Sequence, residues 1–438
     1  MKKGIYISAL MILACLFQAM AENPVVAPAQ KKPVMLVGGT IHTGNGDVIE
    51  NGTIVFVNGK ITSVGRTADI NIDTSGYEVI DVTGKQVYPG LIFPSTSLGL
   101  QEIGSGVDVA TDNREIGTLN PDVRAIVAYT ADSQVTPVIR ANGILLAQIV
   151  PVGSLLPGTS SVVQLDAWDW EDAAYKMDNG IQLGWPRKAT MTRRNSYFRM
   201  GATGGNTYEQ NVEELEKIFT DAAAYAAVEK PEHANLRLEA MKGLFDGSKI
   251  LFLSSDEPKG IIEGITFAKR HGVKKIVLSD ADESAWTVRD FLKENGIPVL
   301  LADPLSLPKY DYSDTRLPFK LAAMFHKEGI LIGLTYSNQA YGNLPFAAGE
   351  TVAYGLTKEE ALQTVTLNSA KILGIDDKTG SIEVGKDANI VVSTGDLLDM
   401  STNNVVLAFI TGRNISLDNK HKQLYRRFEA KYEHLYTK

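Results

Sequence analysis

Cysteine is almost absent from this chain. Of its 438 residues only Cys15 carries a thiol, and it lies in an apolar N-terminal segment that we expect to be removed. The mature chain would then have no thiol, which excludes disulfide bonds and thiolate metal sites. The segment Ile12-Leu13-Ala14 before Cys15 resembles a bacterial lipoprotein box, but Leu13 fits it poorly, so a lipid anchor on Cys15 is the less favoured alternative.

The chain also lacks an apolar run long enough to cross a bilayer. The run Ile5–Phe17 follows two lysines and is too short to span. Ala19-Met20-Ala21 fits the small-x-small cleavage pattern, so residues 1–21 are predicted to be a signal peptide cleaved near Ala21-Glu22. The alternative is that this run is a single membrane anchor, and its short length disfavours that alternative. We therefore expect a periplasmic or secreted protein with no transmembrane segment.

The chain has fewer basic than acidic residues. The chain has 43 Lys and Arg against 51 Asp and Glu, a net charge of −8. Loss of the two leader lysines would take this to −10, with 41 basic residues against 51 acidic ones. Binding of nucleic acid needs a basic face, so nucleic acid is excluded as a general partner. The apolar content of 44% is ordinary for a globular protein.

Strand-like segments occur near both ends of the predicted mature chain. Residues 22–33 form a polar, Pro-containing linker that we expect to be flexible, and residues 34–87 contain short β-type runs. Asn58-Gly59 predicts a hairpin there, because a type I′ turn needs positive φ at both central residues. Residues 380–418 return to β-type runs. Neither piece can bury a sheet face alone, so we expect them to combine.

The middle of the chain, residues 88–379, alternates short apolar runs with helical patterns, which predicts a parallel sheet or barrel. The runs that suit buried parallel strands are Ile144–Pro151, Lys249–Leu253, Lys275–Leu278, Pro298–Leu301 and Ile330–Leu334. The helical patterns are Tyr208–Val228, Asn235–Phe245, Gly260–Arg270, Ala285–Asn295 and Pro318–Glu328. Residues 419–438 predict an amphipathic helix docked on the barrel surface, and a partner-binding or membrane-surface helix is the lesser alternative.

Four segments, in this order along the chain, resemble the amidohydrolase superfamily, specifically its imidazolonepropionase-like branch. They are T-I-H-T-G-N-G-D-V-I-E-N-G from Thr40, V-Y-P-G-L-I-F-P-S-T-S-L-G from Val87, A-Y-G-L-T-K-E-E-A-L-Q-T-V-T-L-N-S-A-K-I-L-G-I from Ala353, and G-S-I-E-V-G-K-D-A-N-I-V-V from Gly380. The resemblance implies an α/β fold, with a (β/α)8 TIM-like barrel at 88–379 and a composite β-sandwich built from 34–87 and 380–418.

The resemblance further implies a divalent metal at the mouth of the barrel. In the family, two histidines on strand one, one histidine after each of strands five and six, and an aspartate after strand eight hold it. The usual first-strand pattern P-G-[FL]-I-D-x-H-x-H-L-G places serines at both histidine positions here, and a neutral hydroxyl is a poor ligand. No cofactor is therefore expected. The degenerate family positions are Ser95, Ser97, Ser254, Ser255, Asp280 and Tyr336.

The six histidines do not restore the site, because none follows a predicted barrel strand. All are expected to have structural or surface roles, with His271 at a helix C-terminus. They are His42, His233, His271, His326, His421 and His434.

Two other chemistries could use the mouth. Asp256, Asp280 and Asp282 could hold a hard cation such as calcium or magnesium, although helix capping is the favoured role for these acids. A nucleophilic serine would need a base within hydrogen-bond reach, and no histidine is expected there. The loop Gly153–Gly158 is expected to shape the pocket. The candidate ligand-binding residues are Gln101, Asp256, Asp282 and Ser337.

Two functions follow. The favoured one is an exported amidohydrolase-like barrel that is catalytically silent and binds a small molecule or a partner, as a homo-oligomer or with a metal-competent paralogue. The alternative is a hydrolase of carbon–nitrogen bonds, in non-peptide or cyclic amides, with an unconventional or reduced metal site. A barrel fold alone does not decide between them, since it supports many chemistries.

Overall fold

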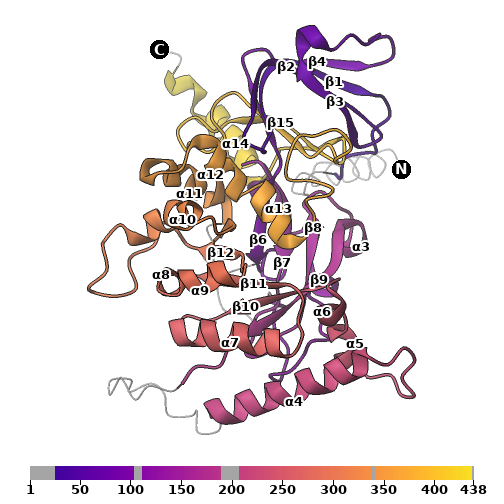
Figure 1. Ribbon diagram of the computed structural model, residues 1–438. Helices are drawn as coiled ribbons and strands as arrows, with labels where there is room; N and C mark the ends of the chain where they lie inside the picture. Colours follow the sequence, from indigo (N-terminus) through magenta and orange to yellow (C-terminus); the bar gives the residue numbers. More distant parts are fainter. Residues whose placement is uncertain (1–24, 103–110, 189–206, 337–340, 437–438) are drawn as a thin grey trace, which may run out of the picture.

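The computed structural model describes residues 25–102, 111–188, 207–336 and 341–436, arranged as two eight-stranded sheets with helices packed around one of them (Figure 1). The predicted signal peptide and Cys15 lie outside the described residues. Within these four ranges, no helix has both the length and the apolar character needed to cross a membrane.

One sheet forms a nearly closed barrel whose strands are adjacent in chain order. Most of their side chains are buried, as expected for strands covered on both faces, although the first half of β9 is not. The Thr335 hydroxyl donates a hydrogen bond to the carbonyl of Pro94 and so joins the last strand to the first. The strands are β6 (Leu91–Thr96), β7 (Ile144–Ile149), β8 (Thr159–Gln164), β9 (Ala174–Gly184), β10 (Ile250–Ser254), β11 (Ile276–Ala281), β12 (Val299–Ala302) and β13 (Ile332–Thr335). The predicted barrel is confirmed.

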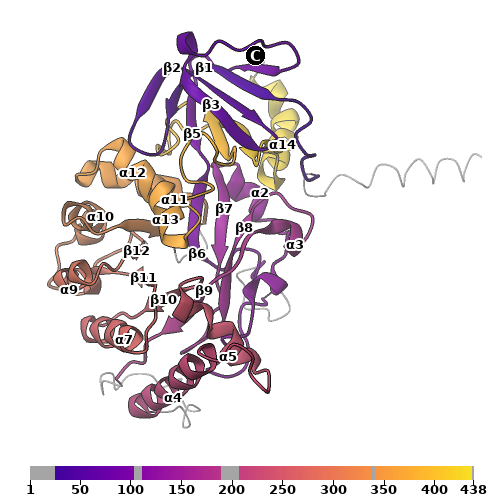
Figure 2. The ribbon, with the colours of Figure 1, turned by 45° about the vertical axis from the view of Figure 1, so that its right-hand side comes forward.

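Helices cover the outside of the barrel from β9 onward (Figure 2). In α7 (Pro258–Arg270), Ile261, Ile265 and Ala268 are fully buried, because they recur on one face at helical spacing. The other helices of this domain are α2 (Thr136–Arg140), α3 (Trp170–Ala173), α4 (Tyr208–Ala226), α5 (Leu236–Met241), α6 (Gly243–Asp246), α8 (Glu283–Trp286), α9 (Arg289–Glu294), α10 (Leu317–Lys327), α11 (Leu344–Glu350), α12 (Lys358–Thr364) and α13 (Leu367–Leu373).

The barrel departs from regular β/α alternation at one side. Strand β8 runs antiparallel to both β7 and β9, and the connection from β7 to β8 contains no helix. The sequence did not predict β8 or β9, since Ser160, Ser161 and the polar start of β9 interrupt any apolar run. Because β8 is reversed, its first residue lies at the same end of the barrel as the last residue of β7.

The second sheet contains segments from both parts of the chain that the sequence analysis combined. Its order is β16-β15-β14-β5-β1-β2-β3, with β4 pairing with β1. In the turn between β2 and β3, Asn58 has φ 49° and Gly59 has φ 79°, which confirms the predicted type of turn. The strands are β1 (Val34–His42), β2 (Val48–Val57), β3 (Lys60–Arg66), β4 (Glu78–Asp81), β5 (Gln86–Pro89), β14 (Ile390–Ser393), β15 (Val405–Ile410) and β16 (Arg413–Asn414).

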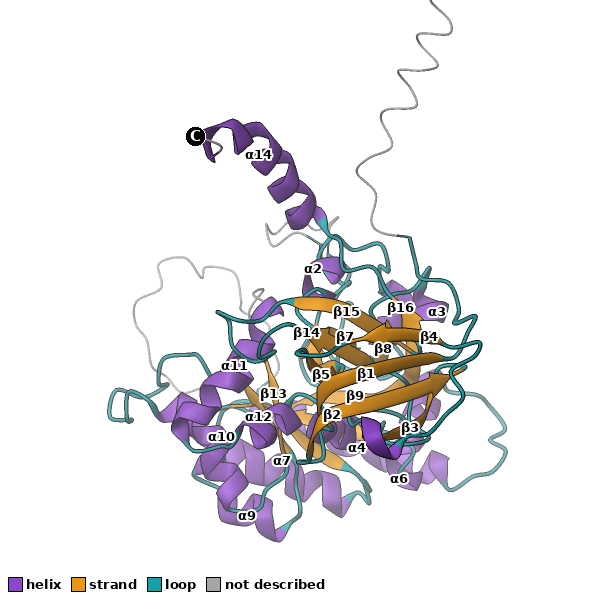
Figure 3. Ribbon diagram, turned by 90° about the horizontal axis from the view of Figure 1, so that it is seen from above, coloured by secondary structure: helices purple, strands orange, loops and turns teal. Residues whose placement is uncertain are grey.

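Two terminal segments differ from expectation. The described end of the predicted linker is docked, since Ala27 is buried and its N–H donates to Asp166 at 3.0 Å. The predicted C-terminal helix is present as α14 (Lys420–Tyr436), but it projects from the body of the protein (Figure 3). The expectation that this helix docks on the barrel is wrong, because its side chains from Leu424 to Tyr432 are exposed.

His42 of β1 connects the composite sheet to the barrel helix α12. Its Nδ1 lies 2.6 Å from Glu359 and its Nε2 lies 2.9 Å from Gln86, and its ring stacks on Tyr88. Burial alone would lower the pKa of His42, but the hydrogen bonds with Glu359 and Gln86 and the carboxylates of Glu359 and Asp396 outweigh it and raise the pKa above 6.5. His42 therefore has a structural role, as expected.

The raised pKa predicts a pH-dependent stability. A histidine whose pKa is higher in the folded than in the unfolded chain stabilises fully below the unfolded pKa of 6.5, and this contribution is lost as the pH rises through the folded pKa. We expect Glu359→Gln to lower the unfolding midpoint most below pH 6.5 and progressively less in alkaline solution. Denaturant titrations of both proteins across this range measure the difference. An equal loss at every pH would show that the His42–Glu359 contact is not an ion pair.

Candidate functional site

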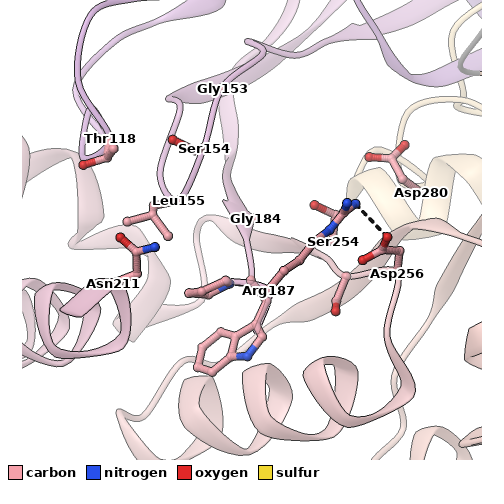
Figure 4. Close-up of a pocket in the computed structure, with 13 residues that line it drawn as sticks. Thr118, Gly153, Ser154, Leu155, Gly184, Arg187, Asn211, Ser254, Asp256 and Asp280 are labelled. Carbon is pink, nitrogen blue, oxygen red and sulfur yellow. Dashed lines mark ion pairs between the residues drawn. The ribbon is translucent and has the colours of Figure 1, made fainter. Parts of the chain in front are cut away.

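A cavity of about 790 Å³ opens at the barrel end where β9, β10 and β11 finish (Figure 4). Barrel proteins place their functional groups at this end of the strands. The loop after β7 forms one wall, at the place expected for Gly153–Gly158. The lining residues are Thr118, Gly153, Ser154, Leu155, Gly184, Trp185, Pro186, Arg187, Asn211, Ser254, Ser255, Asp256 and Asp280. Four residues singled out from the sequence therefore meet here: Ser254, Ser255, Asp256 and Asp280.

Ser95 and Asp280 form a hydrogen-bonded pair across the barrel. The Ser95 hydroxyl donates to the Asp280 carboxylate at 3.3 Å, although the two residues lie on strands one and six. Both have a left-handed backbone, with φ 53° at Ser95 and φ 51° at Asp280. Non-glycine residues adopt this conformation rarely, and such strain is concentrated at functional sites.

Asp280 faces the cavity with a perturbed acidity. The Asp280 side chain is exposed to the cavity, but the barrel around it still excludes part of the water and raises the pKa of its carboxyl. The hydrogen bond from Ser95 opposes this rise, and the nearby Asp303 carboxylate adds to it. A perturbed carboxyl in a cleft is a candidate for binding or proton transfer.

A chain of buried polar groups continues from Ser95 into the barrel. The Ser95 N–H donates to the Gln148 side-chain oxygen at 3.1 Å, and the Gln148 amide donates to the Ser160 hydroxyl at 3.1 Å. Ser160 donates to Asn179 and accepts from Gln182. These four supporting residues were not predicted from the sequence, because they belong to β7, β8 and β9, and neither β8 nor β9 has an apolar run that marks it as a strand. The lone glutamine in the apolar run Ile144–Pro151 is the one signal that could have indicated them.

Other candidate positions lie away from the cavity lining. The Ser97 hydroxyl is 3.1 Å from the Tyr341 hydroxyl, and Tyr336 is half-buried against the hydrophobic core. Gln101 forms an isolated bridge with Thr111. Ser337 lies outside the described residues.

The acidic candidates have separate partners. Asp256 is 2.7 Å from Arg187, and helix α7 is preceded by Glu257, so the capping role expected for Asp256 is wrong (Figure 4). Asp280 lies within β11 and caps no helix either. Asp282 does cap α8, since it accepts the Ser284 N–H at 2.8 Å.

No clustering of potential metal ligands is seen in the four described ranges, where no group of three or more His, Cys, Asp or Glu side chains could hold an ion. Two further histidines pair with glutamates that do not line the cavity. His271 ends α7 as expected and pairs with Glu216 at 2.8 Å, and His326 pairs with Glu360 at 3.0 Å.

Residues 194–415 match the model of the amidohydrolase family. The chain belongs to this family. The imidazolonepropionase of Thermoplasma volcanium is 25% identical over 378 residues, covering 81% of this chain and 88% of its own length. The imidazolonepropionase of Shewanella frigidimarina is 32% identical over 184 residues, 41% of this chain and 38% of its own. A solved amidohydrolase from Thermotoga maritima has 23% identity and a TM-score of 0.72, covering 87% of this chain and 99% of its own. The predicted family and branch are confirmed.

The metal that the family implies does not fit the described residues of the mouth. Ser95, Ser254 and Ser255 are neutral hydroxyls at physiological pH. Two carboxylates line the cavity, and one of them, Asp256, is paired with Arg187, which leaves Asp280 alone. A transition metal in a hydrolytic site takes imidazole or several carboxylate ligands. The described residues of the mouth therefore offer no such ligand set.

Proposed function

We propose that this protein is an exported amidohydrolase-family barrel that binds a small molecule at its mouth and does not hydrolyse it with metal-activated water. The observation that carries the proposal is the pair Ser95–Asp280, which stands on strands one and six, where the family's metal ligands are expected. Loss of imidazole at several such positions together removes the means of lowering the pKa of a bound water.

The cavity suggests the chemistry of the ligand. Its volume of about 790 Å³ is within the usual range of small-molecule pockets. The Asp280 carboxylate is bonded by a neutral hydroxyl, so it is available to accept an N–H of a ligand. Asn211 lies on the opposite side of the cavity, where its amide can bond a carbonyl (Figure 4). A small or cyclic amide presents both groups.

Association with a metal-competent paralogue would supply hydrolysis in trans.

The test combines metal analysis with ligand binding. We expect the purified mature protein to contain far less than one zinc, iron or manganese ion per chain and to show no turnover of a panel of cyclic amides and dipeptides. Asp280→Asn should weaken the best-binding amide by about 10- to 100-fold, since a hydrogen bond to a charged group contributes about 1.5–3 kcal/mol. Calorimetry or thermal shift measures this.

The matched control is Asp290→Asn, a carboxylate on α9 that is 77% exposed, which should leave binding unchanged. Stoichiometric transition metal with turnover that is lost in Ser97→Ala or Tyr336→Phe would contradict the proposal.

A hydrolase of carbon–nitrogen bonds is the second candidate. It is favoured by the relatives that are named as imidazolonepropionases and by the raised pKa of Asp280, 3.3 Å from a serine hydroxyl, because such a carboxyl can act as a general base. Metal-independent turnover of any amide in the panel, lost in both Asp280→Asn and Ser95→Ala, would establish it.

A further inference from the structure

Helix α14 has an apolar face that the body of the protein does not cover. Leu424, Phe428 and Tyr432 recur every four residues and are 37%, 50% and 40% exposed. Tyr425 beside them is 66% exposed. A helix of this length is marginally stable alone in water, and helical stability usually comes from packing an amphipathic face. The face therefore needs a partner.

The base of α14 is held firmly, so the helix is presented in a fixed direction. Ile415 is buried, and Asn419 is also buried and caps the helix by accepting the Lys422 N–H at 2.9 Å. Asp418 bonds Arg426, eight residues further along the chain, at 2.9 Å. The helix that these contacts hold projects from the body of the protein (Figure 3), and its apolar side chains are exposed.

Local charge distinguishes between possible partners. Within its bounds α14 carries five Lys or Arg residues and two Glu residues, while the whole chain has a net charge of −8. The body is thus strongly acidic. The acidic body of each copy repels an anionic lipid surface and also repels the other body, so net charge alone favours neither partner. A protein partner can instead present a local acidic surface to the basic helix, and such a surface is present on this chain.

The body offers a matching surface close to the base of the helix. Trp168 lies two residues before α3 and is 66% exposed, and the acidic residues that follow it in sequence, Asp169, Glu171 and Asp172, are also exposed. Asp166, two residues before Trp168, is hydrogen-bonded to β16, the strand that precedes α14. The Arg413 guanidinium of β16 donates to the Asp166 carbonyl at 2.8 Å. Figure 3 shows α2 and α3 on the side from which α14 leaves.

We propose that two copies of this chain form a two-fold dimer in which α14 of each packs on the α3 surface of the other. Leu424, Phe428 and Tyr432 would cover Trp168, and the basic side chains flanking them would lie against Glu171. Two-fold symmetry uses the contact twice, so each of the two modest surfaces contributes to the interface in both copies.

Light scattering after size exclusion tests the dimer in the full mature chain. Wild type should be dimeric, and Phe428→Glu and Trp168→Glu should each weaken dimerisation about ten-fold or more, with unchanged circular dichroism. Val384→Glu is the matched control, since Val384 is 63% exposed and belongs to neither of the two proposed surfaces, and it should remain dimeric.

A charge swap makes the test specific to this pairing. Lys431→Glu and Glu171→Lys should each weaken the dimer, and the double variant should recover part of the loss. A monomeric wild type at the highest attainable concentration would overturn the proposal. So would a dimer that survives both Phe428→Glu and Trp168→Glu, or a monomer that floats with phosphatidylglycerol vesicles through Phe428.

Discussion

Asp166→Ala should lower the free energy of unfolding by about 3–5 kcal/mol, the usual cost of removing one partner from a buried ion pair. Asp166 is 1% exposed and Arg140 is 4% exposed, with 2.6 Å between the carboxylate and the guanidinium. Asp166 also binds Arg413, at 3.2 Å, and the Ala27 N–H. The substitution leaves the Arg140 charge inside the protein without its counter-ion and releases the N-terminal segment and β16 together.

Urea unfolding followed by circular dichroism and by tryptophan fluorescence measures this loss. The matched control is Lys293→Ala, which breaks an exposed ion pair with Glu328 and should cost no more than about 1 kcal/mol. Limited proteolysis should also cut Asp166→Ala near Ala27 faster than wild type. A cost equal to that of Lys293→Ala would mean that water reaches Arg140 in the folded protein.

Gly180→Ala should destabilise the barrel by about 1–3 kcal/mol or more, because the added methyl group has no space. A Cβ at Gly180 of β9 would lie 2.6 Å from the Ile250 carbonyl oxygen and against the ring of Phe252. The carbonyl is part of the pairing between β9 and β10, so it cannot move without breaking the ladder. The strands would have to separate.

Gly65→Ala in β3 is the control for Gly180→Ala. The nearest atom to a Cβ at Gly65 is Ile70 Cδ1 at 3.8 Å, an ordinary van der Waals distance. Thermal unfolding should therefore separate the two variants, with little change for Gly65→Ala. Similar midpoints for both would indicate that β9 and β10 relax without cost.

The sequence predicted the parts of the fold in which local pattern and burial agree. Strands such as Ile330–Leu334 are short apolar runs between helical segments, and Asn58-Gly59 requires one turn geometry. Strands β8 and β9 could not be predicted in this way. Their interior side chains are Ser160, Asn179 and Gln182, which are buried because they bond one another, and hydrophobic periodicity cannot detect that compensation.

The sequence predicted only part of the candidate site, because local pattern locates some of its residues and not the others. The positions after strands five and six could be located, so Ser254, Asp256 and Asp280 were named, and all three line the cavity. Arg187 and Asn211 were not named, since they come from segments with no family pattern, and only folding brings them to the cavity. The orientation of α14 depends on side-chain contacts at its base, which amphipathic spacing does not encode.

The composite sheet has a consequence for how the chain is made. Strand β5 pairs with β1 along one edge and with β14 along the other, so the second edge of Val87 has no partner until Val392 has been synthesised. About three hundred residues of the barrel are synthesised in the interval. The chain therefore cannot complete its first sheet until translation is nearly finished, which leaves the nascent polypeptide open to holding chaperones.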